Sequence, residues 1–267
     1  MKWLLNALAL SGLMLFASSS FAGMWLADDT GDLYHIASPG GAIDTIGSSG
    51  VSGLTALTMD SAGNLYSTDG ANLYTLNKTT GLASLVGSFG GTSGIEGLAF
   101  DGIDTLWGAN GGGLFIINTG TGFASFVSAM THSYDDLAVA KSDVAGTSIV
   151  AGDLLGLDAT TNAIYEIDFG TYVEALVESV PLTVGDEAIT TDTDGVIYTH
   201  NFDREPGGLG GIYQVDVSGA SLDTFVMTTN PRITGMFLDS AGDPVPAPGV
   251  LWLLGAAFVG LRLNRRH

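Results

Sequence analysis

Short hydrophobic stretches separated by turn residues recur along most of the chain, and this pattern predicts β-strands instead of helices. The clearest stretch is a tetrapeptide whose second residue is aromatic, at Tyr34, Tyr74, Phe115, Tyr165 and Tyr213. Successive aromatics are 40, 41, 50 and 48 residues apart. A spacing this regular indicates an internal repeat, which limits the possible folds more strongly than any single element.

Each repeat predicts four short strands. The first strand ends in a turn and lies at residues 57–60, 98–101, 137–140, 189–192 and 236–239. The second strand lies at residues 24–26, 64–66, 105–107, 148–150 and 196–198. The aromatic tetrapeptide is the third strand, and a fourth follows it, for example at residues 83–86, 124–127 and 224–227.

Four-stranded units of this length, repeated in series, predict an all-β fold of the β-propeller type, because only neighbouring blades bury the faces of each sheet. Residues 24–48 supply strands two to four of a unit whose first strand appears only at residues 233–239. We therefore predict a five-bladed β-propeller over residues 23–243, with the N- and C-terminal strands sharing one blade. A six-bladed or incomplete ring, with an irregular blade within residues 129–163, is the alternative. The aromatics at fixed positions are expected to pack between blades.

Two stretches of the repeat have a recognisable composition: Gly-Leu-Ala-Phe-Asp at residues 97–101 and Asn-Leu-Tyr at residues 64–66. The pattern is similar to NHL and gluconolactonase-like propellers over about 215 residues. This resemblance implies the propeller fold; it implies an activity only where the catalytic residues match as well.

The N-terminal segment has the layout of a secretory signal peptide. Lys2 precedes an apolar run from Leu4 to Phe16, and small residues lead to a cleavage site after Ala22. We expect residues 1–22 to be removed during export by the Sec pathway. The apolar run is too short for a membrane anchor.

The C-terminal residues 244–267 combine three features: a proline-rich start that includes Val245, Pro246, Ala247 and Pro248, an apolar stretch from Gly249 to Leu261, and the bases Arg262, Arg265 and Arg266. This order resembles the PEP-CTERM sorting signal. The resemblance implies a short transmembrane helix, an inner-membrane-tethered precursor and a membrane-embedded exosortase that moves the protein towards the cell surface. Here Ala247 replaces the usual glutamate, so a variant sorting enzyme or retention as a membrane anchor are alternatives.

Composition and charge narrow the function. Hydrophobic residues make up 46% of the chain and charged residues 13%, which is typical of a chain that folds. Without cysteine there is no disulfide and no thiolate chemistry. Outside the two terminal signals the chain has all 28 acids but only four bases, so the net charge of this body is −24. The bases are Lys78, Lys141, Arg204 and Arg232. Such a surface repels nucleic acid and attracts divalent cations and basic partners.

Aligning the five first strands brings one column of residues to the start of each, namely Thr55, Glu96, Asp135, Glu187 and Thr234. In a propeller these positions face one level of the central channel, so we expect the carboxylates to converge, with Asp136 and Asp186 beside them. Two carboxylates ~8 Å apart repel by roughly 2 kcal/mol. Glu96, Asp135 and Glu187 are therefore candidate ligands of Ca²⁺, and a solvated acidic funnel is the alternative.

Two functions from different classes fit these observations. The first is a non-catalytic β-propeller exported to the cell surface or matrix and associated with exopolysaccharide or biofilm, to whose contacts Trp25, Trp107 and Tyr172 could contribute. The second is a calcium-dependent lactonase-type hydrolase, implied by the gluconolactonase resemblance, in which a channel metal polarises a lactone carbonyl. That family's ligand set also includes an asparagine, which the column lacks. We expect no cofactor other than Ca²⁺, and as partners a sorting enzyme, exopolysaccharide or surface proteins.

Overall fold

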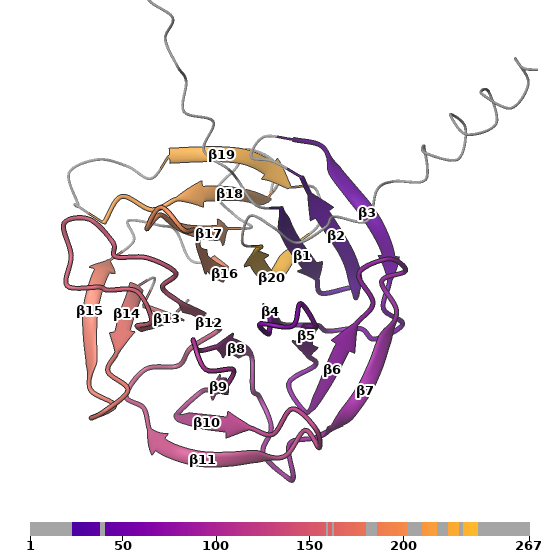
Figure 1. Cartoon of the computed structure of the whole chain (residues 1–267), viewed down its shortest axis with the longest axis horizontal. Coiled ribbons are helices and arrows are strands. Elements are labelled where there is room, and N and C mark those ends of the chain that lie inside the picture. Colours follow the sequence, from indigo (N-terminus) through magenta and orange to yellow (C-terminus); the bar gives the residue numbers. More distant parts are fainter. Residues whose placement is uncertain are drawn as a thin grey trace, which may run out of the picture.

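The chain folds into a ring of β-sheets (Figure 1). This computed structural model describes residues 23–37, 41–158, 160–161, 163–179, 186–201, 210–217, 224–229 and 232–239. These residues form five separate four-stranded sheets. Within these ranges no helix is long and apolar enough to cross a membrane. The predicted signal cleavage site and the predicted sorting tail lie outside the described residues.

Each sheet is one blade, and its strands are given from the channel outwards. Blade 1 contains β20 (Ile233–Leu238), β1 (Met24–Asp28), β2 (Asp32–Ile36) and β3 (Ile43–Ser48). Blade 2 contains β4 (Ala56–Met59), β5 (Leu65–Thr68), β6 (Asn72–Leu76) and β7 (Ala83–Ser88). Blade 3 contains β8 (Gly97–Phe100), β9 (Leu106–Asn110), β10 (Gly113–Ile117) and β11 (Ala124–Ala129). Blade 4 contains β12 (Asp136–Val139), β13 (Leu154–Asp158), β14 (Ala163–Ile167) and β15 (Glu174–Ser179). Blade 5 contains β16 (Asp186–Thr191), β17 (Ile197–Asn201), β18 (Gly210–Gln214) and β19 (Thr224–Thr229).

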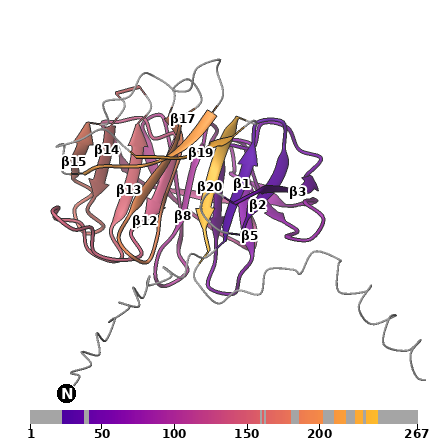
Figure 2. The same ribbon diagram turned by 90° about the horizontal axis from the view of Figure 1, so that it is seen from above.

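The two ends of the described chain close the ring in one blade. Strand β20 pairs antiparallel with β1, with Trp25 opposite Phe237 and Met24 opposite Leu238. The innermost strands β4, β8, β12, β16 and β20 surround the centre, and β3, β7, β11, β15 and β19 form the rim (Figure 1). Figure 2 shows the ring from the side, where β20 lies beside β1. The molecule is therefore a five-bladed β-propeller with a shared first blade, as the sequence predicts, and the six-bladed alternative is wrong.

A repeated aspartate shapes the turn between the first two strands of a blade. Asp101 accepts hydrogen bonds from the backbone N–H groups of Ile103 (3.0 Å) and Thr105 (2.9 Å), and its other oxygen accepts one from the Trp107 indole (3.0 Å). Asp60 and Asp192 make the same set of bonds, with the hydroxyls of Tyr66 and Tyr198 in place of the indole. Each aspartate thus ties its turn to an aromatic ring at a blade interface.

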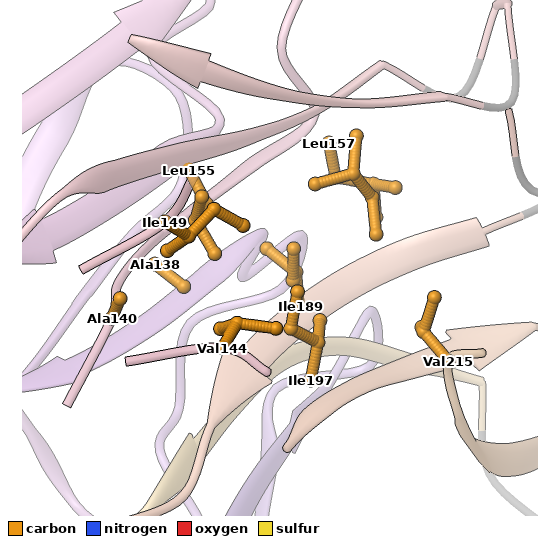
Figure 3. Packing of buried hydrophobic residues seen from close by; sticks show 10 residues of the cluster. Ala138, Ala140, Val144, Ile149, Leu155, Leu157, Ile189, Ile197 and Val215 are labelled. Carbon is orange, nitrogen blue, oxygen red and sulfur yellow. The ribbon is translucent and has the colours of Figure 1, made fainter. Parts of the chain in front are cut away.

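The hydrophobic core consists of five clusters, and each cluster draws on two neighbouring blades. Trp107 of β9, for example, packs with Leu137 of β12, and Tyr198 of β17 packs with Met236 of β20. Figure 3 shows the cluster between blades 4 and 5, where Leu155 and Leu157 of β13 lie near Ile189 of β16. The second-strand aromatics Trp25, Tyr66, Trp107 and Tyr198 therefore pack between blades, because a single sheet cannot bury both of its own faces.

The two outermost strands of every blade share an irregularity. In blade 3 the pairing shifts between Leu114 and Phe115, which leaves Val127 as an extra residue in β11. The same shift occurs in the other four blades. Val127 then packs into the cluster between blades 3 and 4. Such a bulge twists the exposed edge strand and discourages pairing with another chain.

Blade 4 contradicts one element of the prediction. The second strand was expected at residues 148–150, but β13 begins at Leu154, and these residues belong to the connection between β12 and β13. Ile149 is nevertheless buried, in the cluster between blades 4 and 5 (Figure 3). A short apolar run predicts burial well, but it does not distinguish a strand from a buried loop.

Candidate functional site

The acidic column lies at the start of the innermost strands, as predicted. Glu96 and Asp135 directly precede β8 and β12, while Glu187 and Thr234 are the second residues of β16 and β20. Each column residue precedes the position that pairs with the second strand of its blade, for example Gly97 opposite Ala109. The common register places the column at one mouth of the channel.

The structure brings two of the three predicted metal ligands into electrostatic contact. Burial raises the pKa of Glu96, and the neighbouring charge of Asp135 raises it further. This coupling is the repulsion expected from the sequence, and it would favour either a proton or a cation between the two carboxylates. Among the described residues, no three histidine, aspartate or glutamate side chains are grouped so that they could hold a metal ion.

The third candidate ligand, Glu187, has a cationic partner that the sequence alignment did not anticipate. The guanidinium of Arg232 donates from Nε to both carboxylate oxygens of Glu187, at 2.8 and 2.7 Å, and Nη2 donates as well. Arg232 also lies 3.8 Å from the carboxylate of Asp29. A bidentate pair of this kind uses the carboxylate oxygens that a metal would need.

The two threonines of the column differ in their surroundings. Thr234 is buried, and its hydroxyl donates a hydrogen bond to the carbonyl oxygen of Leu54 in the loop before β4. The Thr55 hydroxyl is buried without a hydrogen-bond partner among the described residues. The column is therefore a mixture of paired and unpaired groups instead of a uniform ring.

One residue further along each innermost strand, the channel narrows. The residues at this level are Ala56, Gly97, Ala188 and Gly235 in four blades and Asp136 in blade 4. A side-chain carbon at Gly97 would lie 2.9 Å from the backbone of Asp136, and one at Gly235 would lie 2.6 Å from the backbone of Ala56. Neighbouring innermost strands approach so closely here that most blades require a very small residue.

Blade 4 has Asp136 at this level. Its side chain is fully buried. Its two carboxylate oxygens accept hydrogen bonds from the backbone N–H groups of Leu137 (2.9 Å) and of Ile189 in β16 (3.0 Å). The N–H of Leu98 in β8 bonds to it as well. One carboxylate thus joins the inward-facing edges of three innermost strands, which otherwise have no strand to pair with.

Burial raises the pKa of Asp136 well above its ordinary value, and the charge of Asp135 adds to the rise, whereas the hydrogen bonds from Ile189, Leu137 and Leu98 oppose it. A buried carboxylate of this kind holds the ring together in both protonation states, because an oxygen of the neutral acid still accepts N–H bonds. At the start of β12, Asp136 lies between Asp135 of the acidic column and Leu137, which belongs to the wall of the central cavity.

A cavity of about 630 Å³ occupies the other half of the channel, and all five innermost strands contribute to its wall. Its inner surface is mostly apolar and includes Leu57, Met59, Phe100, Leu137, Met236 and Phe237. Its volume lies within the range of small-molecule sites, about 300–1,000 Å³. Within the described part of the chain, Lys141 is the only base in this wall.

The acids in the cavity wall are engaged in hydrogen bonds of their own. Asp60 and Asp101 hold their turns and aromatic partners. Asp104 accepts hydrogen bonds from the backbone N–H (2.8 Å) and the hydroxyl of Ser61, which ties the loop of blade 3 to that of blade 2. Asp239 accepts a bond from the Trp25 indole at 3.4 Å. These carboxylates are therefore structural groups at the rim of the cavity.

Lys141 reaches from the end of β12 across to blade 1. Its backbone N–H donates to the Thr191 hydroxyl at 3.2 Å, and its amino group donates to the carbonyl oxygen of Leu238. The same amino group lies 4.2 Å above the centre of the Phe237 ring. Burial lowers the pKa of Lys141 to about 8, although the charges of Asp239 and Asp192 oppose the shift.

Neither the cavity nor Lys141 was predicted from the sequence. One signal was available, because the repeated turn aspartate becomes Ala140 in blade 4 and a base follows it. Of the aromatics considered for contacts, Trp25 and Trp107 are buried between blades, at 1% and 6% exposure, while Tyr172 is half-buried. The tryptophans are thus packing residues in this structure.

The fold and channel define the class of the molecule as a five-bladed β-propeller with a central cavity. No protein-family model matches the sequence, and no curated protein matches it. The structure is similar to a chain in the crystal structure of a nidogen/laminin complex, with a TM-score of 0.54 and 12% identity over 82% of this chain and 81% of that chain. It also matches selenomethionine-substituted virginiamycin B lyase from Staphylococcus aureus, with a TM-score of 0.45 and 15% identity over 82% of this chain and 74% of that chain. At these identities the likeness to the nidogen/laminin complex shows the fold alone.

Proposed function

We propose that the protein is an exported, non-catalytic binding propeller of the cell surface or extracellular matrix. The observation that carries this proposal is the cavity of about 630 Å³ in the centre of the ring. Its wall is mostly apolar, and its aspartates are used in turns, so it suits binding better than acid–base chemistry. Exopolysaccharide of a biofilm is the proposed binding partner, which is consistent with the sorting signal.

A matched pair of variants tests the binding role of the cavity. Gly102 lies in its wall, and a side chain at this position meets no atom within 4 Å. Gly112, in the turn between β9 and β10, is equally open and lies away from the cavity wall. Gly102→Trp should weaken binding to exopolysaccharide from a producing strain, measured by calorimetry, while Gly112→Trp should bind like the wild type. Equal binding by both variants would remove the cavity from the proposal.

The proposed cellular location is inferred from the two predicted terminal signals, and it can be tested separately. The protein would be exported by the Sec pathway with cleavage after Ala22, held in the inner membrane by its tail, and passed to the envelope surface by an exosortase-like enzyme. The intact mass of the protein recovered from a producing strain measures both cleavages. A mass that includes residues up to His267 would contradict sorting by cleavage and favour a retained membrane anchor.

A calcium-dependent lactonase-type hydrolase is the second candidate, and the raised pKa of Glu96 beside Asp135 favours it. A bound Ca²⁺ would relieve the repulsion between these carboxylates and could polarise a carbonyl group. The pairing of Glu187 with Arg232 argues against a three-carboxylate site. Calorimetry with Ca²⁺ on the wild type and Glu96→Gln, together with a sugar-lactone assay with and without chelator, tests this candidate. Calcium heat that Glu96→Gln abolishes would support it.

A further inference from the structure

We propose that Lys141 is a covalent binding site for the carbonyl group of a small neutral ligand in the central cavity, with the aldehyde of a reducing sugar as the favoured class. The inference rests on the proposed binding function of this cavity and names the chemistry of its ligand. It starts from the position of one amino group.

The geometry holds the amino group of Lys141 in a defined place within the cavity wall. Its backbone is fixed to the Thr191 hydroxyl, and the side chain spans to the carbonyl oxygen of Leu238 on blade 1. The Phe237 ring lies 4.2 Å below the nitrogen. A lysine with three such contacts is ordered at the site before any ligand arrives, which reduces the entropy lost on reaction.

The charges around the cavity select a neutral ligand. Asp60, Asp101, Asp104 and Asp239 lie in the same wall, and the body carries a net charge of −24, from four bases and 28 acids. These charges repel an anionic ligand, and the mostly apolar inner surface disfavours burial of a charge of either sign. The apolar inner surface and the volume of about 630 Å³ accommodate an uncharged molecule of sugar size.

The interior position also makes the amino group reactive. Its surroundings disfavour the ammonium form, so a larger share of Lys141 is the free amine at neutral pH than for an ordinary lysine. The amine lone pair attacks the carbonyl carbon, a C–N bond forms, and the carbonyl oxygen takes up a proton to give a carbinolamine. Loss of water then gives an imine, so the step needs no oxidant or reductant.

The chain provides an internal control for the experiment. Outside the signal peptide its only lysines are Lys141 and Lys78. Lys78 follows β6 and is not part of the cavity wall. Comparing the two lysines within one molecule requires no variant, so a folding defect cannot mimic the result.

The test is reductive trapping on the full chain with glyceraldehyde and cyanoborohydride at pH 7.5, followed by peptide mass mapping. Because burial lowers the pKa of Lys141 to about 8, a substantial share of it is free amine at this pH, so Lys141 should be labelled at least about tenfold faster than Lys78. Lys141→Arg should lose the label, and its melting temperature reports whether it folds. Glycerol, which lacks the carbonyl, should not protect or label the site.

The outcomes separate this inference from the binding function on which it rests. Labelling of Lys141 and Lys78 at equal rates, or no label on Lys141, overturns the covalent site. If exopolysaccharide still binds the wild type and Lys141→Arg equally in that case, the binding function stands without it. If Lys141 is labelled selectively but exopolysaccharide does not bind, the reactive lysine stands and the proposed function fails.

Discussion

Blade 4 differs from the other four blades at positions that the repeat otherwise keeps constant. Four blades end their innermost strand with an aspartate that binds an aromatic ring of the second strand, at Asp60, Asp101, Asp192 and Asp239. Blade 4 has Ala140 and, on its second strand, Leu155, which pairs with Ala138. Aliphatic packing therefore suffices at this interface, and the freed position is next to Lys141.

Further departures gather in the same blade. Asp136 occupies a level where the other blades have alanine or glycine, and Tyr172 adopts a left-handed φ of 56° at a turn position taken by Gly81 and Gly122 in blades 2 and 3. The three positions are equivalent, because the backbone N–H of Tyr172, Gly81 and Gly122 each donates a hydrogen bond to the carbonyl oxygen four residues earlier. Blades 1, 2, 3 and 5 therefore keep the residues that packing between blades requires. Blade 4 departs from them and places Asp136 and Lys141 at the channel.

The largest expected effect is at Asp136. Asp136→Ala would give blade 4 the small residue of its neighbours but leave the three N–H groups of Leu98, Leu137 and Ile189 without their acceptor. We expect the free energy of unfolding to fall by about 4 kcal/mol, measured by urea denaturation. Asp136→Asn, which keeps one acceptor oxygen, should lose less than half of this. A loss below about 1 kcal/mol for alanine would show that water replaces the carboxylate.

The stability difference between the wild type and the Asp136 variants should also depend on pH. The folded state raises the pKa of Asp136 above the ordinary 3.8, so its contribution to stability is greatest below that pH and is lost as pH rises towards the folded pKa. The stability difference between the wild type and Asp136→Asn should therefore shrink as the pH rises. A difference that grows with pH would mean that the N–H groups stabilise the ionised form more than burial destabilises it.

Substitutions at this turn position should affect stability differently in blade 3, which has Gly122, and in blade 4, which has Tyr172. In Gly122→Ala the new carbon would lie 2.4 Å from the Gly87 carbonyl oxygen, at a φ of 78°. We expect a loss of about 3 kcal/mol in thermal or urea unfolding. Tyr172→Gly should change stability by less than about 1 kcal/mol, because relief of the left-handed backbone offsets the lost packing. Similar losses in both variants would argue against a special turn in blade 4.

Glu174 ties blade 4 to the loop after blade 3, and its expected effect is intermediate. It accepts hydrogen bonds from the Thr131 backbone (2.8 Å), the His132 backbone (3.1 Å) and the Tyr134 hydroxyl (2.7 Å). Burial opposes ionisation, yet hydrogen bonds from the Thr131 hydroxyl, the Tyr134 hydroxyl, the Thr131 backbone and the His132 side chain lower the pKa of Glu174 to about 2. Glu174→Gln should cost about 1.5 kcal/mol at pH 7, after allowance for solvent screening.

The pH dependence of Glu174→Gln provides its control. The contribution of a carboxylate with a lowered pKa is full above the ordinary 4.5 and is lost as pH falls towards 2. Wild type and variant should therefore converge in urea unfolding between pH 4.5 and pH 2. A constant difference across this range would assign the effect to packing instead of charge.

The smallest expected effect comes from making blade 3 resemble blade 4. Asp101→Ala reproduces Ala140 and removes the bonds to Ile103, Thr105 and the Trp107 indole. Because this turn is open to water, we expect a loss of only about 1 kcal/mol. Tryptophan fluorescence and urea unfolding would measure it, and a loss above about 3 kcal/mol would show that blade 4 compensates for its missing aspartate elsewhere.

Much of the fold could be predicted from the sequence because the blade is a local unit. The aromatic tetrapeptides mark strand three of each blade, and the phase of the repeat predicts that residues 24–26 and 233–239 share one blade, as the pairing of β1 with β20 shows. The prediction failed at residues 148–150, where a buried loop has the same apolar character as a strand. The acidic column was found by alignment, but its partner Arg232 could not be, because the ion pair depends on how blades 1 and 5 meet.

The sequence by itself predicted four-stranded propeller blades and the closure of the ring in one shared blade, because the same order of strands and turns returns about every 45 residues. It left a six-bladed ring open and misplaced the second strand of blade 4, and the tertiary structure decided both. The tertiary structure alone decided which charged groups face each other. Asp136 meets N–H groups of both neighbouring blades, and Lys141 reaches the carbonyl of Leu238 almost a hundred residues away. Strand patterns are encoded by neighbours in the chain, whereas the contents of a channel depend on side chains from all five blades meeting in one small volume.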